Sequence, residues 1–246
     1  MTQSRNAVSC NAPSSTPAAV KGENIPFSFE DSLLASRGKP FVFSEGDTRS
    51  LHFEEKYVQS EMSLTAPFEL ALSYTRVMME FRQVTSSPRH VLMIGLGGGS
   101  LAKFCYRNLP ATRLTVVEID ADVIALRDEF MIPPDDDRFQ VIHADGAHYI
   151  DHAKKDVDVL LLDGFNAYGQ AVELSSMRFY CACRRVLTSA GMLVVNLSGA
   201  DADLTYSALR LRAAFEHKTW QRQVPDSNNR IIFAVNQPAR SRCARR

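Results

Sequence analysis

The most chemically suggestive part of the sequence is a run of glycines, Gly95-Leu-Gly-Gly-Gly, which directly follows a short apolar segment. Glycines let the backbone turn tightly and approach a ligand, and a helix that begins after the run presents free amide groups. Glu118 ends the next apolar segment, 23 residues after Gly95, where its carboxylate can accept hydrogen bonds from both ribose hydroxyls of a nucleoside. The spacing predicts a nucleoside site, and a close-packed turn without a ligand is the alternative for the glycines.

Two further carboxylates follow apolar segments in the same way. Asp145, in Ala144-Asp145-Gly146, can accept a hydrogen bond from an adenine amino group, or it is a plain turn aspartate. Asp163 comes directly after a buried-looking apolar run, so that it either points into a crevice at the strand ends or caps a helix. Asp120, two residues after Glu118, is expected to be a helix N-cap.

A nicotinamide dinucleotide enzyme would share the glycines and the ribose acid. Such an enzyme prefers the pattern G-x-G-x-x-G, and Ser100 stands where that pattern has its third glycine. It also has no particular need for an acid-glycine pair after the third strand. An adenosyl-sulfonium compound therefore fits these residues better than a dinucleotide does.

The elements that must position these residues alternate between strand-like and helix-like from residue 89 onward. Short apolar strands separated by helices predict an α/β fold with a doubly wound, mostly parallel sheet of seven strands. Ligands of such sheets bind beyond the carboxyl ends of the strands. The predicted strands are 90–94, 114–118, 139–143, 157–162, 192–197, 219–224 and 231–235, and the main predicted helices are 101–108, 121–130, 175–186 and 203–215.

The chain divides into four regions by composition. Residues 1–24 are predicted to be a flexible tail, residues 25–64 a small N-terminal β region, and residues 238–246 a basic tail. Residues 65–237 form the predicted adenosyl-sulfonium-binding Rossmann-like domain. Within the β region, a Gly-Asp turn at 46–47 predicts a hairpin, and a helix is expected over 66–83, capped by Thr65.

Composition excludes several classes of protein. Twenty-eight basic and twenty-eight acidic residues give a formal net charge of zero, unlike the basic footprint of a nucleic-acid binder. No segment approaches the roughly 20 apolar residues that span a bilayer, and the N-terminus lacks the apolar region of a signal peptide. We therefore expect a cytoplasmic protein with reduced cysteines and no membrane partner. His143 and His148 have poor spacing for metal ligands, so no metal is expected.

From about Leu51 to Val235 the sequence resembles a spermidine synthase-like protein of the polyamine aminopropyltransferase family, which has the class I methyltransferase fold. The resemblance covers roughly three quarters of the chain and depends on the order and spacing of several motifs. These motifs are Val58-Gln59-Ser60, Tyr74, Val91-Leu-Met-Ile-Gly-Leu-Gly-Gly-Gly, Val117-Glu-Ile-Asp120, Ala144-Asp-Gly146, Val157-Asp-Val-Leu-Leu-Leu-Asp163, and Phe179-Tyr-Cys-Ala-Cys-Arg-Arg-Val-Leu before Ala190-Gly191.

The resemblance implies that the chain binds decarboxylated S-adenosylmethionine or methylthioadenosine. Intact S-adenosylmethionine is the candidate co-substrate if the chain is instead a methyltransferase of the same fold. Gln59 and the loop containing Gly95, Gly97 and Gly99 would hold the sulfur-side chain and the nucleoside. Glu118 would bind the ribose, and Asp145 with Gly146 the adenine. Asp163 would be the catalytic carboxylate beside the reacting amine, with Tyr74 and Asn166 in the acceptor region.

The sequence also departs from the family pattern at the positions that bind polyamines. The aspartate of the usual glycine loop falls on Gly98, the second carboxylate of Asp-x-x-Asp is Asn166, and His-Glu after the helix tyrosine is Thr75-Arg76. A diamine is a dication at neutral pH, so fewer carboxylates mean less compensation for its desolvation. The resemblance therefore implies aminopropyl transfer to a small-molecule amine, and the missing carboxylates disfavour putrescine as that amine.

Two other functions stay open. One is an S-adenosylmethionine-dependent methyltransferase of the same fold, in which Arg76 would pair with the donor's carboxylate. The other is a non-catalytic nucleoside-binding homologue. The oligomeric state is left open, with a homodimer among the options.

Overall fold

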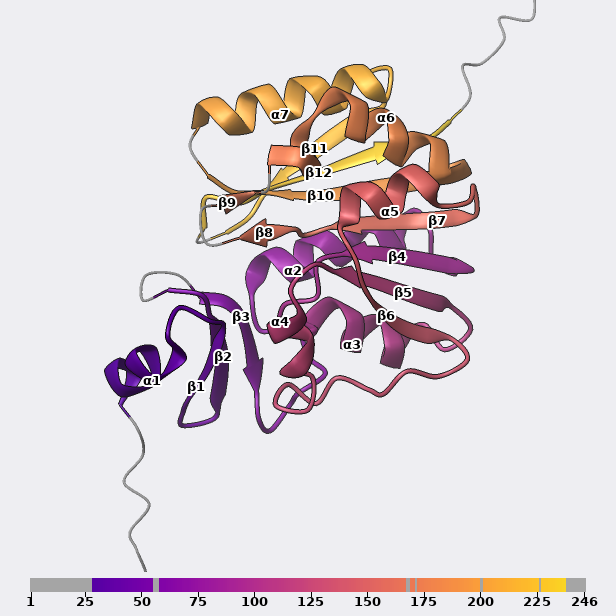
Figure 1. Cartoon of the computed structure of the whole chain (residues 1–246). Coiled ribbons are helices and arrows are strands. Elements are labelled where there is room, and N and C mark those ends of the chain that lie inside the picture. Colours follow the sequence, from indigo (N-terminus) through magenta and orange to yellow (C-terminus); the bar gives the residue numbers. More distant parts are fainter. Residues whose placement is uncertain are drawn as a thin grey trace, which may run out of the picture.

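A computed structural model describes residues 28–54, 58–166, 169–170, 172–199, 201–225 and 227–237, so the predicted tails at 1–24 and 238–246 lie outside the described residues. Within these ranges, seven strands form one sheet in the spatial order β11-β12-β10-β7-β4-β5-β6 (Figure 1). The strands are β4 His90–Ile94, β5 Arg113–Glu118, β6 Phe139–His143, β7 Val157–Leu162, β10 Leu187–Leu197, β11 Thr219–Gln223 and β12 Arg230–Val235.

The strand directions confirm the predicted mostly parallel sheet. β10, β7, β4, β5 and β6 are parallel neighbours, whereas β12 runs antiparallel to β10 and β11 antiparallel to β12. From β4 the chain first builds β5 and β6 on one side and then returns to build β7 and β10 on the other. The order therefore reverses between β4 and β7, and the crevice at such a switch point is where open α/β sheets bind ligands.

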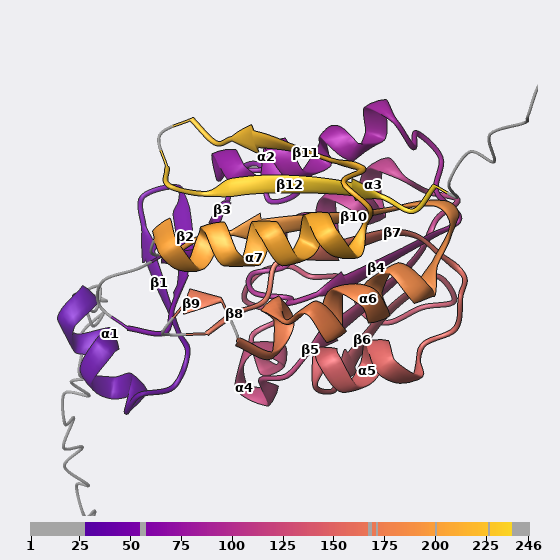
Figure 2. The same ribbon diagram turned by 90° about the horizontal axis from the view of Figure 1, so that it is seen from above.

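Helices cover both faces of the sheet because alternate strand residues point to opposite sides. Val91 and Met93 of β4 pack into one core with α2 (Ser73–Met78) and α3 (Ser100–Asn108). Leu92 and Ile94 pack into the other core with α5 (Gly146–His152), α6 (Met177–Val186) and α7 (Asp201–Ala214). Figure 2 shows α5, α6 and α7 together on one side of the strands. The continuous apolar strands predicted from the sequence are thus buried on both faces.

A small antiparallel sheet precedes this domain, in the order β1 (Phe41–Glu45), β2 (Thr48–His52) and β3 (Val58–Ser63). Gly46 has φ +57° in the turn between β1 and β2, which confirms the predicted hairpin. The region also contains a helix that the sequence analysis missed, α1 (Phe29–Ser36), whose first turn is closed by a capping box between Ser28 and Asp31. The N-terminal β region is therefore partly helical.

The helix predicted over 66–83 is much shorter than expected. α2 begins at Ser73, after Leu72 in an extended conformation, and a 3-10 helix over Met79–Gln83 follows it. Thr65 is not its cap, because the amide and hydroxyl of Thr65 donate to the Asp47 carboxylate at 2.9 Å each. Asp47 in the hairpin turn thus binds Thr65, and the chain after Thr65 does not begin a helix there.

The helix predicted over 121–130 is likewise shorter, because α4 covers only Ala121–Ala125. Arg127 donates to the Pro133 carbonyl and lies 2.7 Å from Asp135, which draws the chain back on itself. Two short strands, β8 Phe165–Asn166 and β9 Gly169–Gln170, pair after β7 and were not predicted. Among the helices of the described ranges, we find no segment with the length and apolar character needed to cross a membrane.

Candidate active site

The glycine run and Asp163 lie side by side at the switch point of the sheet. Gly95 directly follows β4 and Asp163 directly follows β7, and the Asp163 amide donates to the Ile94 carbonyl at 3.0 Å. Gly95 has φ +98°, and a Cβ added to it would lie 2.3 Å from the Asp163 carbonyl oxygen. Only glycine therefore allows these two strand ends to approach so closely.

Two of the remaining glycines of the loop, Gly98 and Gly99, pack tightly against apolar side chains. Gly97 and Gly99 have φ +52° and +67°, and Gly99 is the residue that caps α3. A Cβ on Gly98 would lie 2.7 Å from the Ser60 Oγ and 2.9 Å from the ring of buried Phe130. The aspartate that the family usually carries at this position cannot be accommodated without moving Phe130.

Glu118 lies one strand further along, at the end of β5, and is only 8% exposed. Its Oε2 accepts the Leu96 amide of the glycine loop at 2.8 Å, and its Oε1 accepts the Asp120 amide at 2.9 Å. The carboxylate thus ties the glycine loop to the start of α4, which Asp120 caps as predicted. Each carboxylate oxygen can accept more than one hydrogen bond, so both can also accept from a ligand hydroxyl.

Asp145 follows β6 and caps α5, a helix that the sequence analysis did not predict. Its Oδ1 accepts the His148 amide at 2.7 Å, and the residue is exposed. Gly146 is buried, and a Cβ there would lie 2.5 Å from Ile94 at the end of β4. Asp145 therefore has a structural role as the cap of α5, which is close to the turn aspartate expected as its alternative. Its contact with adenine stays a prediction.

The carboxylate of Asp163 is held by two side chains from distant elements. Tyr74, on α2, donates its hydroxyl to Oδ2 at 3.1 Å, and Asn196, near the end of β10, donates its Nδ2 to Oδ1 at 2.8 Å. Burial raises the pKa of the Asp163 carboxyl above its ordinary value, and the hydrogen bonds from Asn196 and Tyr74 oppose that rise. Burial, together with the adjacent Asp163, raises the pKa of the Tyr74 hydroxyl well above its ordinary value.

This geometry does not make Asp163 a helix cap, because its carboxylate accepts from side chains of α2 and β10. A buried carboxylate at the switch point of the sheet, whose partners among the described residues are neutral donors, can bind a cationic amine or accept its proton. The structure therefore places a carboxylate that can act on an amine directly beside the glycine loop.

Sequence reasoning missed Asn196, Asn229 and Ile119. Asn196 is a buried amide in the otherwise apolar second half of β10, residues 192–197, and that contrast was the available signal. Asn229 donates its Nδ2 to the Asn196 Oδ1 at 2.8 Å from the turn before β12, a contact without a local sequence pattern. Ile119 is 63% exposed between Glu118 and Asp120, which is unusual for a large apolar side chain and places an apolar surface beside Glu118.

Two other predicted residues, Gln59 and Arg76, are not among the side chains that hold Asp163. Gln59 is half-buried on β3, but Ser60 is the β3 residue next to the glycine loop, because strand neighbours point to opposite faces. Arg76 donates to the Leu70 and Ala71 carbonyls at 2.6 Å each, so its guanidinium is bound within its own segment. Asn166 lies in β8, and its side chain is outside the described part of the structure.

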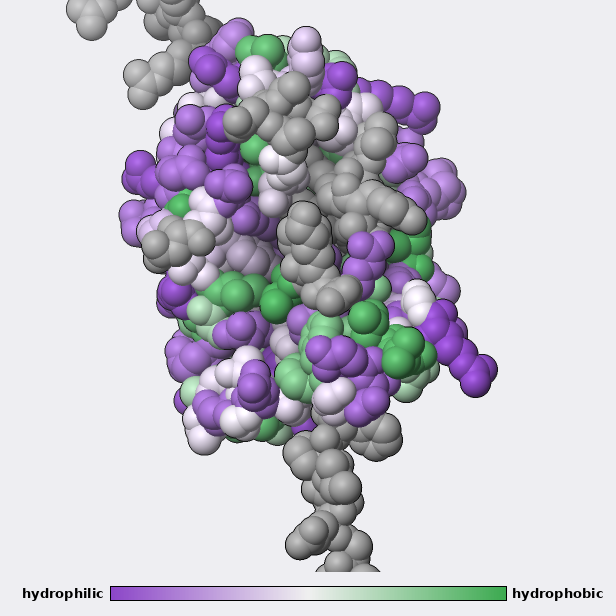
Figure 3. Space-filling view, turned by 90° about the vertical axis from the view of Figure 1, so that its left-hand side faces the viewer, coloured by the Kyte–Doolittle hydropathy of each residue, from purple (hydrophilic) through white to green (hydrophobic). Residues whose placement is uncertain are grey.

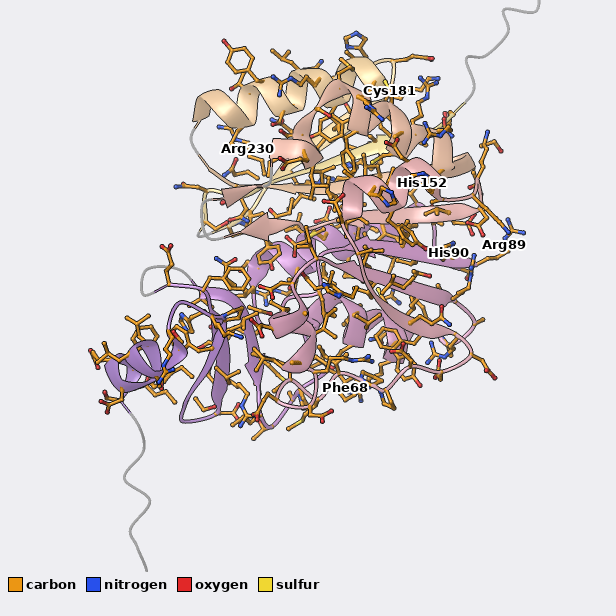
Figure 4. The ribbon with its side chains drawn as sticks, in the orientation of Figure 1. Phe68, Arg89, His90, His152, Cys181 and Arg230 are labelled. Atoms are coloured by element: carbon orange, nitrogen blue, oxygen red, sulfur yellow. The ribbon has the colours of Figure 1, made fainter. Side chains whose placement is uncertain are left out.

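The opposite end of the sheet carries a separate polar cluster. His90, at the start of β4, lies 3.2 Å from Asp156 and 3.1 Å from the Thr115 hydroxyl, and Figure 4 shows it at the far end of β4 from the glycine loop.

Figure 3 faces the side on which α1 and β8 lie, where hydrophobic residues form a band among hydrophilic ones. Across the described ranges, no three His, Cys, Asp or Glu side chains gather as a metal site would require.

The chain is similar to proteins of a known family. The Spermine/spermidine synthase domain matches residues 71–201. A polyamine aminopropyltransferase of Neisseria meningitidis is 38% identical over 195 residues, which are 78% of this chain and 74% of that protein.

Solved structures share the fold. A probable spermidine synthase from Corynebacterium glutamicum superposes with a TM-score of 0.69 at 20% identity, over 81% of this chain and 77% of that chain. Human methyltransferase-like protein 13, in complex with SAH, superposes with a TM-score of 0.60 at 23% identity, over 70% of this chain and 85% of that chain. At these identities both structures show the fold alone, so the methyltransferase reading is supported at the fold level only. The length and identity of the sequence match to the meningococcal enzyme decide the family: the chain belongs to the spermine/spermidine synthase family and is a spermidine synthase-like transferase.

Proposed function

We propose that the protein transfers the aminopropyl group of decarboxylated S-adenosylmethionine to the nitrogen of a small-molecule amine. The observation that carries the proposal is the Asp163 carboxylate, held by Tyr74 and Asn196 directly beside Gly95. Family membership supports the reaction class, and the Asp163 cluster supplies a group that can handle an amine next to the glycine loop.

The donor would lie across the carboxyl ends of β4, β5 and β6. Glu118 would accept hydrogen bonds from the ribose hydroxyls, with its oxygens already oriented by the Leu96 and Asp120 amides. The exposed side chain of Ile119 would cover one face of the nucleobase, and Asp145 and Gly146 would meet its edge. The left-handed turns at Gly95, Gly97 and Gly99 would let the backbone approach the sulfur-bearing chain.

The transfer is an in-line displacement at the propyl carbon attached to the sulfonium. The neutral amine nitrogen forms the new C–N bond while the C–S bond breaks, and the bonding pair leaves with sulfur to give neutral methylthioadenosine. The positive charge passes from sulfur to the new secondary ammonium, which then releases a proton. Holding the two reactants in line supplies most of the rate, since the leaving group needs no protonation.

Asp163 would serve this reaction as the proton acceptor. An amine arrives as an ammonium ion, and the carboxylate offsets the desolvation of that charge and then accepts the proton that frees the lone pair. Its hydrogen-bond partners are both donors, so the carboxylate faces the acceptor amine as a base rather than as an acid. Tyr74 keeps its proton because the pKa of its hydroxyl is raised by burial and by Asp163.

A diamine with two charges would find fewer carboxylates here than the family pattern provides. Gly98 has no room for an acidic side chain, and Asn166 replaces the second carboxylate in the sequence. We therefore propose an amine other than putrescine as the acceptor. The methyltransferase alternative loses its specific support. Arg76 donates to carbonyls of its own segment, so its guanidinium is already bound and does not present itself to the carboxylate of S-adenosylmethionine.

The experiment is a substrate matrix. Purified protein is incubated with decarboxylated S-adenosylmethionine or intact S-adenosylmethionine and with monoamines, putrescine and longer polyamines, and products are identified by mass spectrometry. Methylthioadenosine release together with an aminopropylated amine supports the proposal. Methylation from intact S-adenosylmethionine would overturn it, as would methylthioadenosine binding without turnover of any amine. Efficient use of putrescine would overturn the proposed acceptor preference alone.

A further inference from the structure

A chain of hydrogen bonds with a single direction leads from the β11–β12 turn to Asp163. The Ser227 hydroxyl donates to the Asn229 Oδ1 at 3.0 Å, Asn229 donates its Nδ2 to the Asn196 Oδ1 at 2.8 Å, and Asn196 donates its Nδ2 to Asp163 at 2.8 Å. The turn precedes β12, which lies beside β10 in the sheet (Figure 2). The antiparallel side of the sheet therefore reaches Asp163 through these amides. These side-chain contacts are additional to the backbone pairing that joins β10, β12 and β11.

The direction of this chain is fixed at its outer end. The backbone N–H of Asn229 donates to the Ser227 Oγ at 3.1 Å. Because the Ser227 oxygen already accepts this hydrogen bond, its hydroxyl proton points to the side-chain Oδ1 of Asn229. The Asn229 side-chain NH2 is then left to face Asn196. Because Asn196 is only 2% exposed, the orientation of its amide is set by these protein partners rather than by water.

We propose that Asn229, oriented by Ser227, is a positioning residue for the transfer reaction, which keeps the Asn196 amide turned as a donor toward Asp163. The inference rests on the proposed function, in which Asp163 accepts the proton of the amine. Asn229 does not touch Asp163 in the structure, so its effect passes through Asn196. A buried amide that meets no donor at its oxygen is free to rotate and to present that oxygen to the carboxylate.

The charged surroundings of Asp163 are simple among the described residues. Tyr74 is the titratable side chain that faces it from α2, β10 and the β11–β12 turn present amides, and Gly95 presents backbone. Glu118 lies beyond β4, and its carboxylate is turned to the Leu96 and Asp120 amides. Arg230 begins β12 at the end of the sheet where Asn196 contacts Asp163 (Figure 4). Changes at Asn229 therefore act on Asp163 chiefly through the Asn196 amide.

The consequence is a shift in the protonation of Asp163. With Asn196 rotated, an amide oxygen would face the carboxylate, and only the protonated form of Asp163 could then hydrogen-bond to it. Losing a hydrogen bond to a charged group corresponds to a rise of about 1–2 pH units in the protonation midpoint. Since the basic form exists only above that midpoint, the acidic limb of the rate profile moves to higher pH.

The experiment measures the midpoint in two ways, on the full chain. Aspartate is labelled with 13C at the carboxyl carbon, and the Asp163 signal is identified by its loss in Asp163→Asn; its titration is then compared between wild type, Asn229→Ala and Asn229→Asp. The pH dependence of kcat/KM is measured with decarboxylated S-adenosylmethionine and the amine that the substrate matrix identifies. Asn229→Ala should shift both midpoints upward by about 1–2 units, and Asn229→Asp by more, because its carboxylate attracts the Asn196 NH2 and repels that of Asp163.

Two further variants separate positioning from general structure. Ser227→Ala should give a smaller shift of the same sign, since it removes only the group that orients Asn229. Asn236→Ala is the matched control, because Asn236 follows β12 at its other end and donates to the carbonyls of Arg184, Leu187 and Thr188. It should lower the melting temperature without moving either midpoint.

An unchanged Asp163 titration in a folded Asn229→Ala protein would overturn the inference, whatever the activity. So would an equal shift in Asn236→Ala. Absence of turnover in wild type would instead defeat the proposed function, while the labelled-carboxylate titration would still decide whether Asn229 orients Asn196.

Discussion

At the scale of single residues, Asp163 shows how burial and hydrogen bonding act in opposition on one carboxylate. Burial favours its neutral form and raises its pKa, whereas the donors from Asn196 and Tyr74 favour the charged form. A carboxylate balanced in this way can hold an ammonium ion and still accept its proton. A fully solvated carboxylate would be too weak a base, and one without donors would stay protonated.

The first prediction is that Asp163→Asn slows turnover by roughly 10²–10⁴-fold, the range for removing a positioned acid-base group. The substitution keeps the shape of the side chain, so the calorimetric affinity for methylthioadenosine should stay within a factor of about two. Steady-state kinetics with decarboxylated S-adenosylmethionine checks the rate. Asp122→Asn is the control, because Asp122 pairs with Lys39 on the exposed surface of α4. Wild-type turnover in Asp163→Asn would make the carboxylate structural.

Lys103 is a second residue whose environment opposes its charge. It is fully buried on α3, where its ammonium group donates to the Phe130 carbonyl at 2.7 Å and contacts the Met62 sulfur at 2.9 Å. Burial lowers the pKa of Lys103 to about 8 from an ordinary value of 10.5. No carboxylate is among these two contacts, so the charge is only partly compensated.

The second prediction follows from the sign of that shift. Between about pH 8 and 10.5 the unfolded chain binds the Lys103 proton and the folded chain does not, so stability rises with pH in that window. Below pH 8 the charge is present in both states and its full cost remains. Lys103→Met should therefore stabilise the protein at pH 7 by about 1–2 kcal/mol, since removing a buried charge outweighs the lost hydrogen bond.

Urea unfolding at a series of pH values tests this prediction. The advantage of Lys103→Met over wild type should shrink as the pH rises from 8 to 10.5. Lys39→Met is the matched control, because Lys39 is exposed and pairs with Asp122. A destabilised Lys103→Met at pH 7 would show that the two contacts of the ammonium group outweigh its burial.

At the scale of elements, the sequence predicts best what depends on continuous apolar runs. The strands of the large sheet are short apolar segments buried on both faces, and β4, β6 and β7 match their predicted ranges to the residue. Helix ends were less predictable, because α2 and α4 are shortened by contacts with Asp47 and Asp135 that come from elsewhere in the fold. α1 and α5 were missed because their caps, Ser28 and Asp145, resemble ordinary turn residues.

The candidate site divides in the same way. Glu118, Asp145 and Asp163 could be chosen as candidates because each lies at or just after the end of a strand, and parallel strands bring their ends together. Asn229 could not be predicted, because its contact with Asn196 joins residues far apart in the chain and needs the antiparallel edge of the sheet. Sequence patterns report local periodicity and strand ends, whereas cross-sheet partners depend on the assembled fold.

The third prediction concerns the junction of β4 and β7. Gly95→Ala should destabilise the protein by at least about 2 kcal/mol, because the new Cβ combines an unfavourable φ with a contact against the Asp163 backbone. Methylthioadenosine affinity should fall as well, since the glycine loop must move. Thermal unfolding and calorimetry measure the two effects.

Gly46→Ala separates these two causes. Gly46 also has positive φ, but a Cβ there would meet nothing within 4 Å. It should cost only about 1–2 kcal/mol, the usual penalty of the left-handed conformation. Equal losses of stability in the two variants would show that the close approach of Gly95 to Asp163 contributes nothing.

At the scale of the whole molecule, the small N-terminal sheet is joined to the large domain at the glycine loop. Ser60 of β3 lies against Gly97 and Gly98, and Met62 of the same strand contacts Lys103 on α3. Arg49 of β2 adds an ion pair with Glu129 at 3.1 Å. One face of β3 therefore supports the loop that would hold the donor, which explains why the two parts of the molecule can share one function.

The last prediction tests that support. Ser60 is 5% exposed, and its Oγ lies 2.7 Å from the position of a Cβ on Gly98, so a larger side chain at residue 60 must displace either β3 or the loop. Ser60→Leu should cost about 1–3 kcal/mol of stability, the usual effect of overpacking, and should also weaken methylthioadenosine binding. Ser60→Ala keeps the space and should change both little. Glu61→Leu places the same side chain on the opposite face of β3 and should leave binding unchanged. A displaced loop could not keep its backbone amides and its contact with Glu118 in place, so methylthioadenosine binding would weaken. If Ser60→Leu lowers the melting temperature but binds methylthioadenosine as tightly as wild type, the small sheet stabilises the molecule without shaping the site for the donor.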